Sequence, residues 1–106
     1  MLLLNIEYIP GKKIEALGIA KGSVVQSKNF GKDFMAGMKT LVGGEIASYT
    51  QMLTEARQIA TKRMVDAAEA LGADAVVGLR YASASVMQGA AEITAYGTAV
   101  RIAGEA

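Results

Sequence analysis

Residues 74–102 constrain the fold more than any other stretch of the chain. They read as two adjoining strands joined at Gln88-Gly89, where a tight hairpin is expected. On both strands, both faces of the pleat carry mostly small or apolar residues. A small domain with a single sheet normally has one apolar and one polar face, because only one face packs on its core. We therefore expect the second face to be buried against other copies of the chain.

The composition agrees with a small domain that associates with itself. The 106 residues are 52% hydrophobic but only 6% aromatic, and they include 12 glycines, which allow backbones to approach closely. This length predicts a single domain, residues 1–106. The formal net charge is +1 and the longest basic run is Lys12-Lys13, so we expect no nucleic-acid partner.

The sequence carries no secretion or membrane signal that we recognise. Without Cys there is no disulfide to indicate an oxidising compartment. The short apolar run at the start lacks a cationic segment and is interrupted by Glu7 and Pro10, which argues against a signal peptide and a membrane span. We expect a cytoplasmic protein with no membrane partner.

The first half of the chain predicts an arm, a strand and a short helix. Apolar and polar residues alternate weakly over residues 2–9, which indicates a short strand or arm that ends at a Pro-Gly turn. Residues 14–27 predict the first long strand, with even-numbered residues on one face and odd-numbered residues on the other. Gly18 and Gly22 indicate a bulge, a bend or a close neighbour. Residues 30–42 are compatible with a short amphipathic helix.

Residues 45–71 predict one long helix. Gly72 directly after it is a suitable left-handed stop, and Lys62 and Asp66 form a favourable pair on the exposed side. Apolar residues recur at steps of three and four and form a continuous stripe along one face. This stripe consists of Ile46, Tyr49, Leu53, Ala56, Ala60, Met64, Ala67 and Leu71.

This order of elements predicts a two-layer α+β fold in which one long helix covers one face of a three-stranded sheet. The strands before and after the helix run parallel and lie too far apart to pair. The last strand then lies between them and is antiparallel to both. Such a sheet has two open edges and an uncovered apolar face, which are liabilities for a monomer. Ring-like self-association would remove both.

Several short motifs, weak singly, are fairly specific when they occur together in one order. They are Gly18-x-x-x-Gly22 with Ser27, Asp33-x-x-Ala36, Gly43-Gly44-Glu45-x-x-x-Tyr49, Arg57, Met64, Gly72-Ala73-Asp74-Ala75-Val76-Val77 with Arg80, and Glu92-x-x-x-Tyr96-Gly97-Thr98-Ala99-Val100. With these motifs the chain resembles, over nearly its whole length, the YbjQ-like family of small bacterial and archaeal proteins. The resemblance implies a β-α-β-β subunit that assembles into a homopentamer. The family also carries a heavy-metal-binding label.

The metal label fits the residue types poorly. Soft and borderline metals favour thiolate or imidazole ligands, and the sequence contains neither Cys nor His. Four of the six Met lie where apolar stripes would place them, which favours core packing over metal ligation. No closely spaced acidic cluster offers a hard cation a site within one chain. We name no cofactor and no metal ligand from the sequence.

Six residues are candidates for small-molecule or ion binding at subunit junctions. Glu45 opens the long helix after two glycines, where backbone N–H groups can hold an anion, although a glycine turn with a self-capping Glu is the favoured explanation. Glu45, Tyr49 and Arg57 share one ridge of the helix. Arg57 is expected to pair with Glu92, or with Asp33 of a neighbour. The six candidates are Asp33, Glu45, Tyr49, Arg57, Arg80 and Glu92.

Arg80 and Glu92 lie on the two hairpin strands at roughly opposite positions, so they are expected to form an ion pair that fixes the register. Ser83 and Ser85 share one face and could line a pore or a seam. No base lies near them in the sequence, so they are not candidate nucleophiles.

We assign no catalytic residue from the sequence and do not interpret the chain as an enzyme. Histidine, the commonest general acid or base, is absent, and no two carboxylates are paired at a useful spacing. Three functions stay open. The first is a homopentameric binding protein, the second is a structural or adaptor ring that contacts another protein, and the third is an enzyme with carboxylate and tyrosine chemistry.

Overall fold

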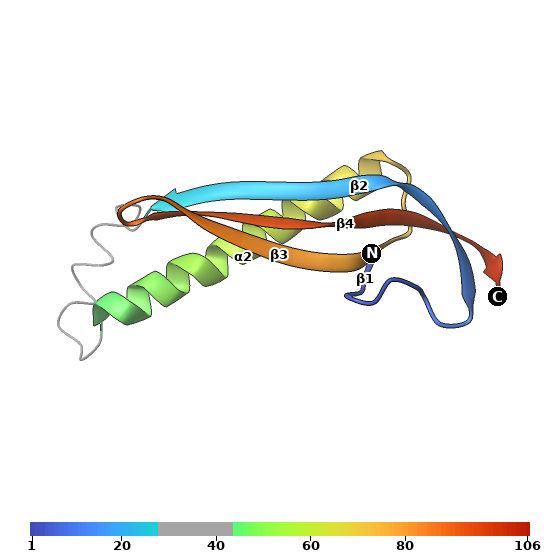
Figure 1. Cartoon of the computed structure of the whole chain (residues 1–106), viewed down its shortest axis with the longest axis horizontal. Helices are drawn as coiled ribbons and strands as arrows, with labels where there is room; N and C mark the ends of the chain where they lie inside the picture. Colours follow the sequence, from blue (N-terminus) through green and yellow to red (C-terminus); the bar gives the residue numbers. More distant parts are fainter. Residues whose placement is uncertain (28–43) are drawn as a thin grey trace.

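The structure, a computed structural model, describes residues 1–27 and 44–106. One helix lies against one face of a long sheet (Figure 1), so the predicted α+β class is confirmed. The short helix predicted for residues 30–42 lies outside the described residues. The elements are β1 (Leu2–Leu3), β2 (Lys12–Ser27), α2 (Gly44–Ala70), β3 (Ala75–Met87) and β4 (Ala90–Glu105).

The sheet has four strands in the order β1-β3-β4-β2. As predicted, β4 lies between β2 and β3 and is antiparallel to both. The prediction of three strands was wrong, because β1 pairs in parallel with the start of β3. The arm continues this pairing, since the amide of Leu4 donates to the carbonyl of Val76 and the amide of Leu79 donates to the carbonyl of Leu4. The first residues of the chain therefore satisfy part of an edge that a three-stranded sheet would leave open.

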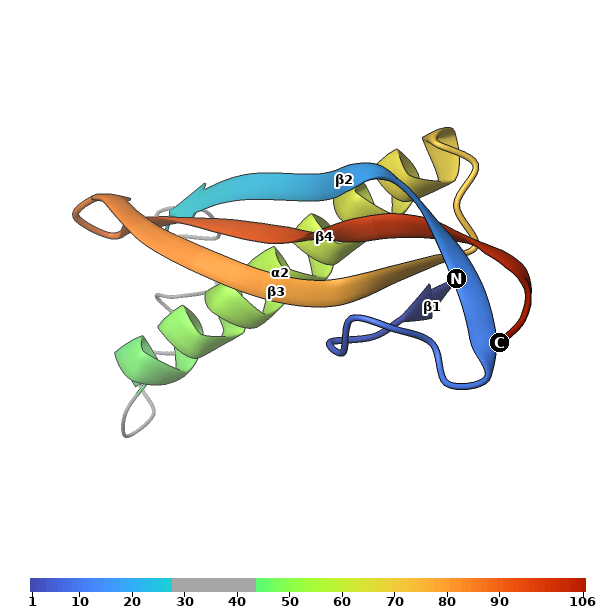
Figure 2. The ribbon, with the colours of Figure 1, turned by 45° about the vertical axis from the view of Figure 1, so that its right-hand side comes forward.

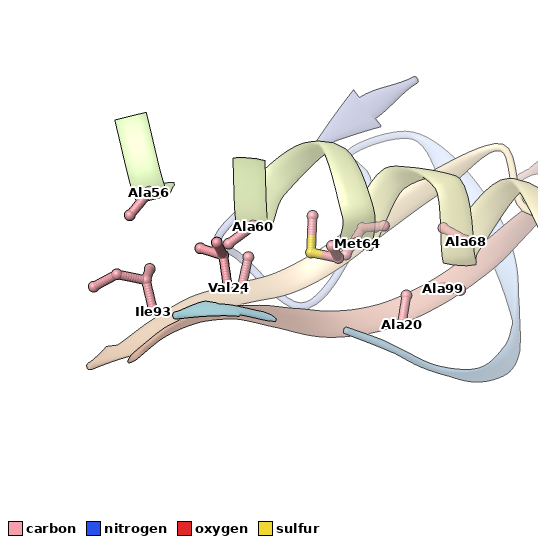
Figure 3. Packing of buried hydrophobic residues seen from close by; sticks show 10 residues of the cluster. Ala20, Val24, Ala56, Ala60, Met64, Ala68, Ile93 and Ala99 are labelled. Carbon is pink, nitrogen blue, oxygen red and sulfur yellow. The ribbon is translucent and has the colours of Figure 1, made fainter. Parts of the chain in front are cut away.

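Small residues bring α2 close to the sheet. Ala56, Ala60, Met64 and Ala68 point toward residues of β2 and β4 (Figure 3), and all four are buried. The predicted stripe is right from Ala56 to Met64. Before this stretch Met52 is buried and the predicted Leu53 only partly so, and after it Ala68 rather than Ala67 is buried and Leu71 is 45% exposed. The helix stops where expected, because Gly72 has a φ of 81°.

Two bulges change which residues of a strand face the helix. The pairing with β4 shifts between Ala16 and Gly18 on β2, and between Val77 and Arg80 on β3. A bulge adds one residue to one strand, so the alternation of faces reverses beyond it. The prediction that all even-numbered residues of the first strand share one face was therefore wrong. Ile14 packs on the side away from the helix, whereas Ala20 belongs to the core under it.

The arm covers the second face of the sheet at the end where the two chain termini lie. Ile9 is 7% exposed and forms a second small core with Ala75, Val77 and Val100, against which Leu4 and Ile14 also pack. The expectation that only other copies bury this face is therefore corrected for this end. Beyond the bulges the face is uncovered, with Ile19 76% and Val25 58% exposed.

Candidate functional site

The long helix crosses the sheet at an angle (Figure 2). A groove lies between the helix and Tyr81 of β3. The contacts of the helix are mainly with β2 and β4 and far fewer with β3. The helix-facing side of β3 is therefore only partly covered, and Tyr81 is 47% exposed. The groove has a volume of about 540 Å³ and is lined by Thr54, Arg57, Gln58, Thr61, Lys62 and Tyr81.

A short chain of hydrogen bonds joins the two walls of the groove. The hydroxyl of Thr61 donates to the carbonyl oxygen of Arg57 at 2.7 Å. It also lies 2.7 Å from the hydroxyl of Tyr81. Because a threonine hydroxyl carries one proton, the proton between the two hydroxyls belongs to Tyr81, which donates to Thr61. Tyr81 is thus held against α2, although it lies on a strand that the helix otherwise covers poorly.

The groove contains two cations, Arg57 and Lys62. No described carboxylate neutralises Arg57. Its Nη2 donates to the hydroxyl of Thr54 at 3.3 Å, and no ion pair joins it to a carboxylate within residues 1–27 and 44–106. The predicted pairing with Glu92 was wrong. Lys62, by contrast, lies 3.1 Å from Asp66, as predicted. The remaining N–H groups of Arg57 are available to an anion, for which a guanidinium has a well-suited planar fork.

The other candidates on the predicted ridge do not join Arg57 in the groove. Glu45 lies in the first turn of α2 as predicted, but its side chain is outside the described part of the structure. Tyr49 is half-buried and is not among the groove residues. Asp33 lies outside the described residues. Of the predicted ridge, the structure therefore assigns only Arg57 to a site.

The predicted ion pair between Arg80 and Glu92 does not form. The register places Arg80 opposite Tyr96 and Glu92 opposite Ala84, because an irregularity near the hairpin and the bulge on β3 both shift the pairing. Arg80 instead donates from Nη1 to the carbonyl oxygen of Asn5 at 2.8 Å and to that of Leu79 at 3.0 Å. These hydrogen bonds of Arg80 therefore hold the arm against β3.

Sequence reasoning missed Thr61 and Tyr81 as residues of the site. Thr61 lies four positions after Arg57, so the helical period could have placed both on one face. Tyr81 could not have been found in this way. The bulge after Val77 decides that Tyr81 faces the helix, and an unbulged strand would turn it to the other face.

The described residues do not fit a heavy-metal centre. No group of three or more His, Cys, Asp or Glu side chains within residues 1–27 and 49–106 could hold a metal ion. The sequence as a whole contains no His and no Cys. Thiolate and imidazole are the ligands such metals prefer, so the donor types of this chain disagree with the label that the resemblance implies.

In the same described part of the chain, no helix has the length and apolar character needed to cross a bilayer.

Comparison with known proteins gives full-length relatives of unassigned activity. A UPF0145 protein of Clostridium novyi is 59% identical over 102 residues, which are 96% of this chain and 99% of the relative. A UPF0145 protein of Thermus thermophilus is 57% identical over 103 residues, 96% of this chain and 90% of the relative.

A crystal structure provides a match at the level of the fold alone. It is a protein of unknown function of the DUF74 family from Pediococcus pentosaceus, with a TM-score of 0.60 and 16% sequence identity, and the match covers 96% of this chain and 97% of that chain. The family model described as "Putative heavy-metal-binding" matches residues 1–103. The chain thus belongs to the YbjQ family of UPF0145 proteins.

Proposed function

We propose that the protein is a homo-oligomeric binding protein, a ring of five copies, that holds a small anion in the groove between α2 and β3 of each copy. The number five comes from the family resemblance. The observation that carries the proposal is the position of the groove, which contains the unneutralised Arg57 and opens beside an unpaired stretch of β3. A neighbouring subunit on that edge would complete the wall of the groove.

The backbone groups on the β3 edge can be assigned from the contacts of the arm. The amide of Leu79 donates outward to Leu4, so the alternate residues Tyr81, Ser83 and Ser85 also direct their N–H and C=O groups away from β4. Within the described residues, β1 pairs only at the start of β3, and no strand pairs with this later part. Such a row of backbone groups is a template for a strand of another chain.

The opposite edge of the sheet is the complementary surface. The carbonyl of Ser23 points outward from β2, because Arg63 of α2 donates to it at 2.7 Å. By alternation, the backbone groups of Ile19, Lys21 and Val25 point outward as well. Arg63 is exposed, so its bond to Ser23 can be exchanged for one from an incoming strand.

A cyclic ring pairs these two edges in a defined direction. Both β2 and β3 are antiparallel to β4, so they run parallel to each other within one subunit. Rotation about an axis along the strands brings β2 of one subunit beside β3 of the next, again in parallel. This contact uses two different surfaces and can close into a ring, whereas antiparallel pairing of two identical edges would give a twofold dimer.

A specific observation favours the adaptor ring as the second candidate. The tip of the β3–β4 hairpin carries apolar side chains in water, with Val86 48% and Met87 68% exposed. Exposed apolar residues grouped in this way are typical of protein contact sites. On this alternative the ring forms in the same manner, and its partner is a second protein rather than a small anion.

Native mass spectrometry of untagged protein tests the proposal. We expect a fivefold assembly with added mass that is lost on denaturation. Arg57→Gln keeps the assembly and loses the added mass, because it removes the unneutralised cation of the groove. Lys13→Gln, which removes the same charge from an exposed site outside the groove, keeps both. A wild-type ring without added mass favours the adaptor, and retention of the added mass by Arg57→Gln contradicts the assigned site.

A further inference from the structure

The sheet face away from α2 contains a second cavity, a cup of about 340 Å³ beneath the arm. Its volume is at the lower end of the range for small-molecule sites, about 300–1,000 Å³. The walls come from the arm and from three strands. The apolar wall residues are Ile14, Ala16, Val77 and Val100, and the polar ones are Glu7 and Thr98.

The two bulges explain why the face is hollow at this place. Thr98 on the central strand pairs with Val77 on one side and with Ile19 on the other. The bulge of β3 begins directly after Val77, and the bulge of β2 lies just before Ile19. Bulges bend a strand and increase its twist, so two of them on either side of Thr98 curve the sheet there. The arm then crosses the hollow and supplies Glu7.

The polar groups of the cup are unsatisfied by the rest of the described chain. Neither the carboxylate of Glu7 nor the hydroxyl of Thr98 has a hydrogen bond or ion pair to another residue in 1–27 or 44–106. The carboxylates of Glu15 and Glu105, at the same end of the molecule, are by contrast paired with Arg101 and Lys12. Glu7 thus brings an exposed and unpaired negative charge to the edge of a cavity whose lining is part polar and part apolar.

We propose that this cup binds a small organic cation, a primary ammonium group on a short apolar chain. The ammonium has three N–H donors and no acceptor, which matches the acceptor oxygens of Glu7 and Thr98. The apolar chain lies against Ile14 and Ala16, which are the accessible apolar residues of the wall. An anion is repelled by Glu7, and a metal ion would find only one carboxylate here. All these residues come from one subunit, so this inference holds or fails separately from the ring and its anion.

Titration of isotopically labelled protein with n-butylammonium, followed by NMR, tests this inference. We expect saturable shifts confined to amides around Thr98, Val77 and the arm, and at least tenfold weaker binding of n-butanol, which lacks the charge. Glu7→Gln keeps the shape of the side chain and weakens n-butylammonium binding about tenfold, as expected for a lost charge-assisted hydrogen bond. Glu69→Gln removes the same charge from an exposed position on α2 and leaves the affinity unchanged.

Thr98→Val supplies a second and nearly isosteric variant, for which we expect a smaller loss of affinity. Equal affinities for n-butylammonium and n-butanol would overturn the proposal, as would equal losses in Glu7→Gln and Glu69→Gln. Shifts spread over the whole sheet, without saturation, would also overturn it. Since butyrate is an anion, it should produce no shifts in the cup even where it binds beside Arg57.

Discussion

At the scale of single residues, Gly22 determines how closely α2 can approach the sheet. A Cβ atom at this position would overlap with the amide nitrogen of Met64 and the carbonyl oxygen of Ala60. These are backbone atoms of the helix, so no side-chain rotation can relieve the overlap. The sequence indicated a bulge, a bend or a close neighbour at Gly22, and the structure shows a close neighbour, the backbone of α2.

We therefore expect Gly22→Ala to lower the free energy of unfolding by about 1–3 kcal/mol, the usual cost of overpacking a core. Urea denaturation followed by circular dichroism measures the change. Lys21→Ala, one residue earlier on the exposed side of the same strand, should stay within about 0.5 kcal/mol of the wild type. Equal stabilities of Gly22→Ala and Lys21→Ala would show that the helix can move away at little cost.

Individual side-chain partners were the least predictable feature at this scale. The residue types and spacing identified Arg57 and Arg80 as cations of interest, but neither pairs with Glu92 as predicted, and the alternative pairing of Arg57 with Asp33 of a neighbour stays a prediction. Arg80 contacts the arm, whose sequence shows only a weak alternation of apolar and polar residues. An ion pair between strands depends on the register, and one extra residue in a strand moves every later pair. A pair within one helix depends only on the helical period and not on a strand register, so the Lys62–Asp66 pair was predicted correctly.

At the scale of elements, the bulge at Gly78 turns Arg80 and Tyr81 to the faces that they occupy. Gly78 has a φ of 63°, in the left-handed region that most residues avoid. Beyond it, Arg80 is directed to the arm and Tyr81 to Thr61 of the helix. The sequence suggested a bulge, a bend or a close neighbour at Gly18 but nothing at Gly78, because a single glycine in a strand is a weak signal.

Gly78→Ala is expected to cost about 1–2 kcal/mol of stability, the usual penalty for a side chain in the left-handed conformation. A Cβ there would meet only the side chain of Glu7, at 3.8 Å, so the cost is conformational rather than steric. Gly78→Asn should lose less than Gly78→Ala, because Asn tolerates this conformation. Thermal unfolding of the two variants measures the difference. If Asn proves worse than Ala, size rather than φ governs this position.

The order and type of the elements were largely predictable. The long helix, its glycine stop, the hairpin at Gln88-Gly89 and the central position of the last strand all follow from periodicity and turn residues. A short strand or arm was predicted for residues 2–9, but its pairing with β3 was missed because two leucines are too short a segment to carry a period. The groove was missed because it depends on the angle at which α2 crosses the strands, and local sequence does not determine that angle.

At the scale of the whole molecule, the single chain has more surface than its mass explains. Its accessible surface is 6630 Å². A monomer of its 11.0 kDa is expected to have about 5,600 Å². Its radius of gyration is 17.2 Å, where a compact domain of similar length has about 13 Å. The excess of about 1,000 Å² is comparable with one side of a standard protein interface, about 800 Å². The proposed ring would bury part of this surface.

Sedimentation velocity of untagged wild type beside Val25→Pro tests the pairing of the β2 and β3 edges most directly. Val25 directs its N–H group to the outer edge of β2, so proline there removes a donor to the neighbour and none to β4. We predict that the wild type sediments as a pentamer and Val25→Pro as a folded monomer with an unchanged circular dichroism spectrum. Val25→Thr, which keeps the N–H group, should remain a pentamer. A wild-type monomer, or a Val25→Pro variant that still forms the pentamer, would contradict the account.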